Sequence, residues 1–163
     1  MSLLVPDLFY SSLFAVDLDA LSARGVDTIL IDLDNTILPR GALNLEDRAH
    51  EWVARAKERF KIGIVSNNSK QHPVEMAQQL GVALVAKALK PSRRGVRAAM
   101  AMLGSTPATT ALIGDQMFTD VLAGNRAGAT TVLVGPLVEY DLPHTLVLRR
   151  LQARIMAGRA PLA

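Results

Sequence analysis

Five short apolar runs, separated by helix-like segments, constrain the fold more than any other feature of this sequence. The runs are TILI (28–31), IGIV (62–65), VALVA (82–86), TALI (110–113) and TTVLV (130–134). Each is rich in β-branched or aliphatic residues and has the length of a strand that is covered on both faces. The runs therefore predict the buried strands of a parallel sheet.

The segments between these runs have the spacing of amphipathic helices. Residues 91–104 place apolar side chains at i, i+3, i+4 and i+7 before a glycine stop: Val96, Ala99, Met100, Leu103 and Gly104. Residues 44–60, with Asn44 as a cap, 73–81 and 118–128 are further candidate helices. Alternating strands and helices predict an α/β three-layer sandwich with a mainly parallel five-stranded sheet. A chain of 163 residues, half of them hydrophobic, fits a single domain spanning residues 1–163.

The composition and the apolar segments indicate the cellular location that we expect for the protein. The chain has no cysteine, which excludes a disulfide framework and a thiolate metal site. The apolar N-terminus lacks a basic leader and carries Pro6 and Asp7, unlike a signal peptide. No stretch has the eighteen or so uninterrupted apolar residues that span a bilayer. We therefore expect a cytoplasmic protein without a transmembrane segment, and leave open peripheral binding at the inner membrane face.

Polar residues follow four of the five predicted strands, at the edge where open parallel sheets bind ligands. They are Asp32, Asp34, Asn35 and Thr36; Ser66, Asn67 and Asn68; Lys87 and Lys90; and, after Gly114, Asp115 and Asp120. Converging carboxylates repel one another and require a positive charge among them. Oxygen ligands without His or Cys favour Mg²⁺, although Mn²⁺ accepts the same set. A lysine and a Ser-Asn pair supply donors for phosphoryl oxygens, so the edge is predicted to bind phosphate and magnesium.

Four segments in order resemble the signature motifs of the haloacid dehalogenase superfamily. They are DLDNT (32–36), Ser66, Lys90 with Pro91, and GDQMFTD (114–120). The resemblance covers the chain from about residue 28 to 134. An aspartate two residues after the first is similar to the pattern of phosphatases and phosphomutases in this superfamily, and is absent from dehalogenases. The resemblance therefore implies a phosphatase.

The resemblance also implies roles for single residues. Asp32 would be the nucleophile that forms an aspartyl phosphate, and Asp34 the general acid and base. Lys90 would offset the charge of the phosphoryl group, which is further bound by Ser66, Asn67 and Thr36. The implied Mg²⁺ ligands are Asp32, the backbone carbonyl of Asp34, and Asp115. Asp120 would orient Lys90 or a metal-bound water from the second layer of contacts.

The short intervals between the motifs leave no room for a cap domain, which is typical of the uncapped subclass IIIA. An open site suits a phosphate carried on a lipid, a protein or a nucleic acid. The N-terminal segment and GDQMFTDVLAGNRAG (114–128) are similar to a bacterial group related to the mitochondrial phosphatidylglycerophosphate phosphatase. This similarity implies hydrolysis of phosphatidylglycerophosphate to phosphatidylglycerol, with an anionic phospholipid at a membrane surface as substrate.

Two basic stretches, residues 87–97 and 144–163, contain no Asp or Glu although the net charge is only +3. Lys and Arg side chains near an anionic membrane each gain about 1 kcal/mol. In the second stretch Leu148, Leu151, Ile155 and Met156 can share a helical face, as an interfacial helix requires. A helix packed on the core predicts the same pattern, so both interpretations stay open. For the N-terminal apolar residues 8–14, packing on the domain is favoured over contact with lipid.

Other functions fit part of the sequence. An uncapped phosphatase of a nucleic-acid end or a phosphoprotein is one alternative, and a non-catalytic phosphate-binding module is another. A signalling receiver is disfavoured because the third predicted strand is followed by no acid that could accept phosphate. One Trp, two Tyr and four Phe provide no evident stacking platform, so no nucleic-acid partner is expected. The sequence does not predict an oligomeric state.

Overall fold

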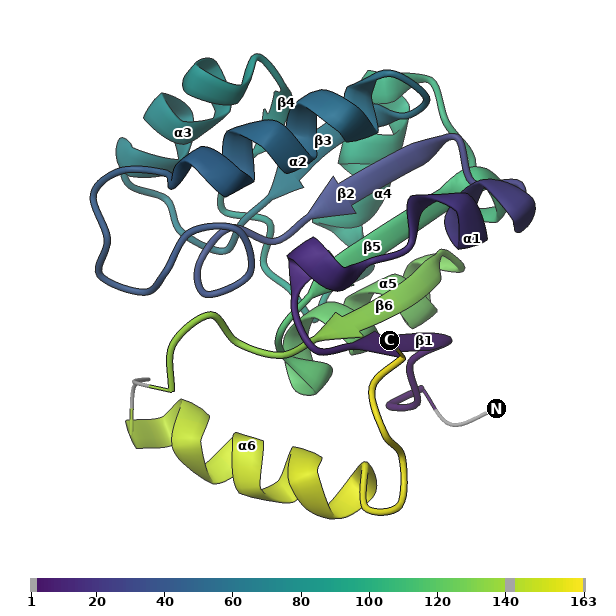
Figure 1. Ribbon diagram of the computed structural model, residues 1–163, viewed down its shortest axis with the longest axis vertical. Coiled ribbons are helices and arrows are strands. Elements are labelled where there is room, and N and C mark those ends of the chain that lie inside the picture. The colour runs from purple at the N-terminus through teal and green to yellow at the C-terminus, as the bar shows by residue number, and fades with distance from the viewer. Residues whose placement is uncertain (1–2, 140–142, 163) are drawn as a thin grey trace.

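A computed structural model of the protein describes residues 3–139 and 143–162. At its centre lies a six-stranded sheet in the order β1-β6-β5-β2-β3-β4, in which every neighbouring pair is parallel. The strands are β1 (Leu8–Tyr10), β2 (Thr28–Ile31), β3 (Lys61–Val65), β4 (Ala83–Val85), β5 (Thr110–Gly114) and β6 (Thr130–Val134). The predicted α/β fold with a parallel sheet and helices on both faces is thus confirmed (Figure 1).

The predicted number of strands was wrong, because the sheet has a sixth strand at its edge. β1 pairs with β6 in the register Leu8 to Val132 and Tyr10 to Val134. Its sequence, LFY, contains no β-branched residue, unlike the five runs that were predicted as strands. Leu8, Tyr10 and Leu13 are buried, so the N-terminal apolar segment closes one side of the sheet, as expected.

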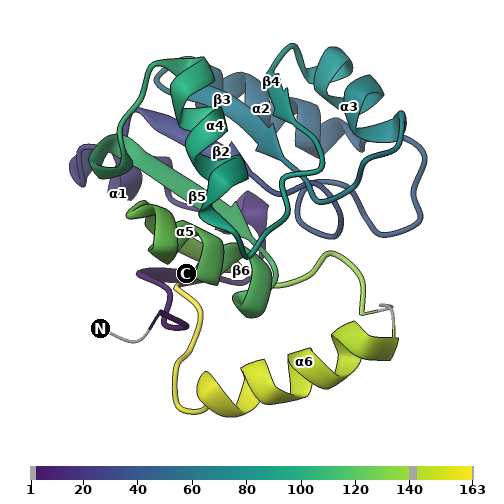
Figure 2. The same ribbon diagram turned by 180° about the vertical axis from the view of Figure 1, so that it is seen from behind.

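Helices cover both faces of the sheet. α1 (Leu18–Ala23), α2 (Asp47–Lys57) and α3 (His72–Leu80) lie on one face, and α4 (Arg93–Leu103) and α5 (Leu122–Ala127) on the other (Figures 1 and 2). Successive side chains of a strand point to opposite faces of the sheet, so the hydrophobic core is divided into one cluster on each face. Ile29 and Ile31 join the cluster under α2, whereas Leu30 joins the cluster under α4.

The first long helix begins later than predicted. α2 starts at Asp47 after Glu46, so Asn44 is not its cap. The intervening Leu45 is buried in the core cluster under α2, which holds residues 44–46 outside the helix. The predicted glycine stops are confirmed, because Gly81 and Gly104 end α3 and α4 with φ of +61° each.

The last helix, α6 (Pro143–Ile155), lies outside the layers (Figures 1 and 2). It packs beside the π-helical turn η3 (Met117–Val121) that follows β5. Among the described residues, no helix has both the length and the apolarity that crossing a bilayer requires. The assignment of residues 1–163 to one domain stays a prediction.

Candidate active site

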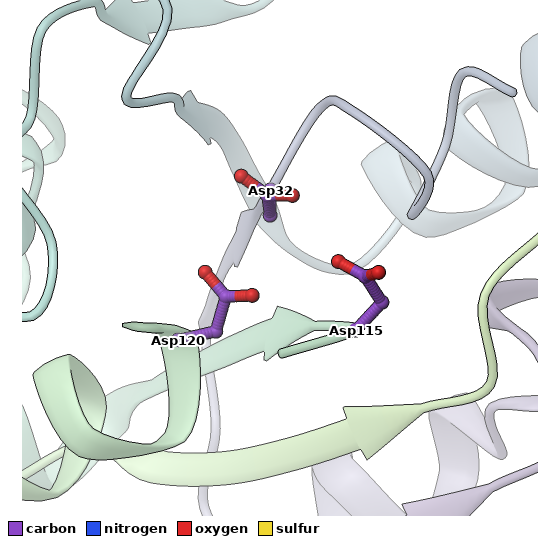
Figure 3. A group of neighbouring side chains, drawn as sticks. All are labelled: Asp32, Asp115 and Asp120. Atoms are coloured by element: carbon purple, nitrogen blue, oxygen red, sulfur yellow. The ribbon is translucent and has the colours of Figure 1, made fainter. Parts of the chain in front are cut away.

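Three aspartates converge where β2 and β5 end. Asp32 directly follows β2, Asp115 directly follows β5, and Asp120 belongs to η3. One carboxylate oxygen from each lies within 4.8 Å of the others (Figure 3). All three are buried, with at most 8% of any residue exposed. The strand order that places β5 beside β2 thus brings together acids that lie more than 80 positions apart.

Lys90 lies among these carboxylates. Its Nζ is 2.5 Å from Asp32 Oδ1 and 2.7 Å from Asp120 Oδ1, and it donates to the Val65 carbonyl at 2.7 Å. Lys87, the other lysine that follows the third predicted strand, is exposed. Lys90 thus lies between the carboxylates of Asp32 and Asp120, and the roles predicted for Lys90 and Asp120 stay predictions.

The protonation equilibria reflect this crowding. Burial raises the pKa of Asp32 to about 8, because the carboxylates of Asp120 and Asp115 add to the effect and Lys90 offsets only part of it. For Lys90, burial lowers the pKa, but Asp120 and Asp32 outweigh it and raise the pKa above its ordinary value. Lys90 is therefore charged, and Asp32 needs more positive charge nearby to ionise at neutral pH.

Thr36 lies between two of the acids. Its buried Oγ1 is 3.4 Å from Asp32 Oδ2 and 3.3 Å from Asp115 Oδ1. A hydroxyl has one hydrogen, so it donates to one of these oxygens at a time. The hydroxyl thus faces carboxylates in this structure, and its predicted contact with phosphate stays a prediction.

Ser66 and Asn67 follow β3 at the same edge. Ser66 is buried, and its Oγ accepts a hydrogen bond from the Asn68 backbone at 3.1 Å. The Asn67 amide pairs with the backbone of Lys90, donating to its carbonyl at 2.9 Å and accepting from its N–H at 2.7 Å. The Asn67 side chain therefore positions Lys90, while the predicted phosphate contacts of both residues stay predictions.

A pocket of about 290 Å³ opens above the site. It is lined by Asp32, Asp34, Arg40, Asn67, Asn68, Lys70, Lys90, Gln116 and Thr119. Asp34 is half-buried and faces the same space as Asp32, as a general acid must. The sequence did not identify Arg40 and Lys70, because both lie in loops where no periodicity or motif marks them.

Gly114 allows Asp120 to approach Lys90. A Cβ atom on Gly114 would lie 2.2 Å from Asp120 Cγ and 2.4 Å from its Cβ. Real Cβ atoms do not approach other atoms this closely. The glycine that precedes Asp115 in the fourth motif therefore makes room for the carboxylate that pairs with Lys90.

Asn35 holds the loop after β2 against the segment after β6. Its backbone has a φ of +67°, which Asn tolerates better than most residues. Its Nδ2 donates to the Val138 carbonyl at 3.0 Å, and its Oδ1 accepts from the Val138 N–H at 3.0 Å. This pairing fixes the backbone that carries Asp34 and Thr36.

Arg149 of α6 reaches the site, which the sequence did not predict. Its guanidinium pairs with the Asp115 carboxylate and donates to the Asp115 carbonyl at 3.3 Å. One turn later, Gln152 Oε1 accepts a hydrogen bond from the Met117 N–H at 2.9 Å. No sequence signal marks this contact, because Arg149 and Gln152 lie outside the four motifs and reach the site only through the path of the chain after β6.

Comparisons with known proteins agree with this arrangement. Residues 88–136 match the family model described as HAD-hydrolase-like. The chain is 34% identical over 155 residues to "Probable phosphatase YqeG" of Bacillus subtilis, covering 94% of this chain and 90% of that protein. It is 30% identical to the chloroplastic phosphatidylglycerophosphate phosphatase 1 of Chlamydomonas reinhardtii, covering 91% of this chain but only 59% of that protein.

The fold also has solved counterparts. The cobalt-bound deoxy-D-mannose-octulosonate 8-phosphate phosphatase of Haemophilus influenzae superposes with a TM-score of 0.57 at 14% identity. The match covers 82% of this chain and 88% of that one. At this identity, the likeness supports the fold alone.

Proposed function

Because the chain belongs to the phosphatases of the haloacid dehalogenase superfamily, we propose that it hydrolyses a phosphomonoester through an aspartyl phosphate on Asp32. One arrangement supports the proposal most directly: Asp32 and Asp34 line the same pocket, and Lys90 Nζ lies 2.5 Å from Asp32 Oδ1. A nucleophile, an acid two residues away and a fixed cation are the groups that phosphoryl transfer to a carboxylate requires.

The proposed reaction has two steps. An Asp32 carboxylate oxygen forms a bond to phosphorus as the bond to the leaving oxygen breaks, and Asp34 gives that oxygen a proton. Asp34 then takes a proton from a water that attacks phosphorus, which releases phosphate and restores Asp32. Lys90 offsets the charge of the phosphoryl oxygens throughout, since it stays charged beside Asp120.

The acidic cluster fits a divalent cation, for which we propose Mg²⁺. Three buried carboxylates compete for Lys90 and Arg149, and burial leaves Asp32 with a raised pKa. Asp32, the Asp34 backbone carbonyl and Asp115 would hold the ion, which would supply positive charge for the carboxylate and the phosphoryl group. Oxygen ligands without His or Cys are the set that Mg²⁺ prefers.

We propose phosphatidylglycerophosphate as the substrate. Two observations support this choice. The curated relative from Chlamydomonas reinhardtii is named for that activity, although this chain spans only 59% of its length. In addition, residues 34–90 contain only α2, β3, α3 and β4 and thus no separate cap domain. The pocket is therefore open to a phosphate that is presented at a membrane surface.

The test is phosphate release from phosphatidylglycerophosphate in mixed micelles, beside soluble sugar, nucleotide and peptide phosphates. Each substrate is assayed with Mg²⁺ and with a chelator, and Asp32→Asn serves as the isosteric blank. We expect Mg²⁺-dependent turnover with preference for the lipid, and radiolabelled phosphate on the wild-type protein but not on Asp32→Asn. Turnover of soluble esters alone would refute the lipid substrate, and full activity of Asp32→Asn would refute the nucleophile.

A further inference from the structure

The outward side of α6 is apolar and exposed. Its large apolar side chains are between 36% and 64% exposed: Leu146, Val147, Leu148, Leu151 and Ile155. Of the four residues whose shared face the sequence left unassigned, only Met156 is buried, against Met117, Val121 and Leu133. The structure thus shows that Leu148, Leu151 and Ile155 are not the residues that pack this helix on the core.

Helical geometry gathers these side chains into one strip. Val147, Leu151 and Ile155 are spaced at i, i+4 and i+8, and Leu148 lies beside them at i−3 from Leu151. Arg150 and Arg154, both exposed, lie along one border of the strip. We call these six residues the outer face of α6.

The opposite side of α6 is used for docking. Arg149 pairs with Asp115, and Gln152 accepts a hydrogen bond from the Met117 backbone at 2.9 Å. Polar contacts therefore fix the rotation of the helix about its axis, and they leave the apolar strip pointing away from the protein. Apart from Met156, the segment turns polar side chains inward and large apolar side chains outward, which is the reverse of an ordinary surface helix.

The charge around this face has one sign. Residues 143–162 contain four arginines and no Asp or Glu, and three of the arginines, Arg150, Arg154 and Arg159, are exposed. An apolar strip with a basic border is typical of a helix that lies in the interface of an anionic membrane. The apolar strip lies along one convex helix, so a fluid bilayer can contact it over its whole length.

We propose that the outer face of α6 binds the surface of a bilayer that contains anionic lipids. The proposal deepens the proposed function, since it places a membrane beside the phosphatase site. One arginine side chain separates the helix backbone from Asp115. A bilayer on the outer face would then lie one helix diameter, roughly 10 Å, farther out.

The test is co-sedimentation with vesicles that contain no phosphatidylglycerophosphate, so that binding is independent of substrate and turnover. Vesicles of phosphatidylcholine with phosphatidylglycerol are compared with vesicles of phosphatidylcholine alone. We expect wild type and Asp32→Asn to bind the anionic vesicles equally. Val147→Asn/Leu151→Asn and Arg150→Gln/Arg154→Gln should each lower the partition coefficient at least tenfold, because they remove the apolar area and the charge that would contact the bilayer. The replaced side chains are exposed, so we expect the fold to stay intact.

Matched variants control for position. Leu43→Asn/Met102→Asn changes two apolar side chains that are 77% and 60% exposed elsewhere, and Arg94→Gln/Arg97→Gln removes the same charge from α4. Both should bind as wild type does. Release of phosphate from a soluble aryl phosphate ester should be unchanged in the α6 variants. Vesicle binding thus tests the membrane-binding proposal, and hydrolysis of the soluble ester tests the catalytic proposal separately.

Three results would overturn the proposal. One is wild-type protein that does not bind anionic vesicles. Another is binding that the α6 substitutions leave unchanged, or that the α4 substitutions weaken equally. The third is self-association without lipid that the α6 substitutions abolish, which would assign the outer face to a second copy of the chain.

Discussion

The guanidinium of Arg149 pairs with the carboxylate of Asp115, the residue that directly follows β5 and that we propose as a ligand of the divalent cation. Asp115 is fully buried and the Arg149 side chain is 17% exposed, so water screens the pair poorly. Two positive groups that need the same carboxylate oxygens compete for them. Docking of α6 and binding of the cation are therefore expected to oppose each other.

Replacing Arg149 with Ala should strengthen Mg²⁺ binding. An exposed ion pair is worth up to about 1 kcal/mol, or roughly fivefold in affinity, so the loss of this more buried pair should raise the affinity at least that much. Isothermal titration of the metal-free protein with Mg²⁺ measures this directly, without substrate. Arg150→Ala is the matched control, because it removes the same charge from an exposed neighbour and should leave the affinity unchanged. Equal or weaker binding by Arg149→Ala would show that the arginine supports the cation site instead.

The effect of Asp34→Asn should depend on the leaving group. A general acid contributes about 10²- to 10⁴-fold when the leaving oxygen needs a proton. An activated aryl phosphate leaves without that help, whereas the alcohol of phosphatidylglycerophosphate does not. We therefore expect a much larger loss of kcat on the lipid than on the aryl ester, measured under the same micelle conditions. An equal loss on both substrates would contradict the acid–base assignment of Asp34.

Some of this site follows from the sequence because the fold places strand ends together. β2, β3 and β5 are covered on both faces, so their apolar runs stand out, and the residues after them meet at one edge. The convergence of Asp32 and Asp115 could be predicted for that reason. β1 was not predicted, because its sequence LFY contains no β-branched residue, whereas each of the five predicted runs contains at least one.

Other contacts depend on the path of the backbone between elements. Arg149 meets Asp115 across 34 positions because α6 returns beside η3, and no local pattern specifies that return. Asn67 pairs with the Lys90 backbone because two loops approach each other with the right spacing. Residue type predicted a phosphate contact for Asn67, because an amide group can donate to a phosphoryl oxygen. The same group can donate equally well to a peptide carbonyl, so residue type alone could not predict the contact with the Lys90 backbone.

The stability of the metal-free protein should depend on pH through Asp32. The folded state raises the pKa of Asp32 from 3.8 to about 8, so it binds this proton more tightly than the unfolded chain does. The contribution of Asp32 is therefore most favourable below pH 4 and declines as pH rises to about 8. Asp32→Asn removes the titration. The difference in free energy of unfolding, variant minus wild type, should grow by about 1 kcal/mol per pH unit in this range.

Urea unfolding in chelator at pH 5, 6, 7 and 8 provides the measurement. Because the two proteins share their other titrating groups, the difference between them isolates Asp32. A difference that stays constant with pH would mean that Lys90 keeps Asp32 ionised throughout, against the effect of burial.

Gly114→Ala should disturb the site through Asp120. The added Cβ would lie 2.2 Å from Asp120 Cγ, so the carboxylate must move away from Lys90 or the strand must shift. Overpacking of this kind costs about 1–3 kcal/mol, and loss of the Asp120–Lys90 pair should reduce kcat as well. Gly63→Ala in β3 is the control, since its Cβ would press only on the ends of two leucine side chains, at 3.1 and 3.2 Å, and would meet the Ala83 carbonyl oxygen at an ordinary 3.8 Å. In a double-mutant cycle, Gly114→Ala should cost clearly less in an Asp120→Gly background, because the atoms that clash are gone. Equal costs in both backgrounds would locate the damage in the strand and not in the contact with Asp120.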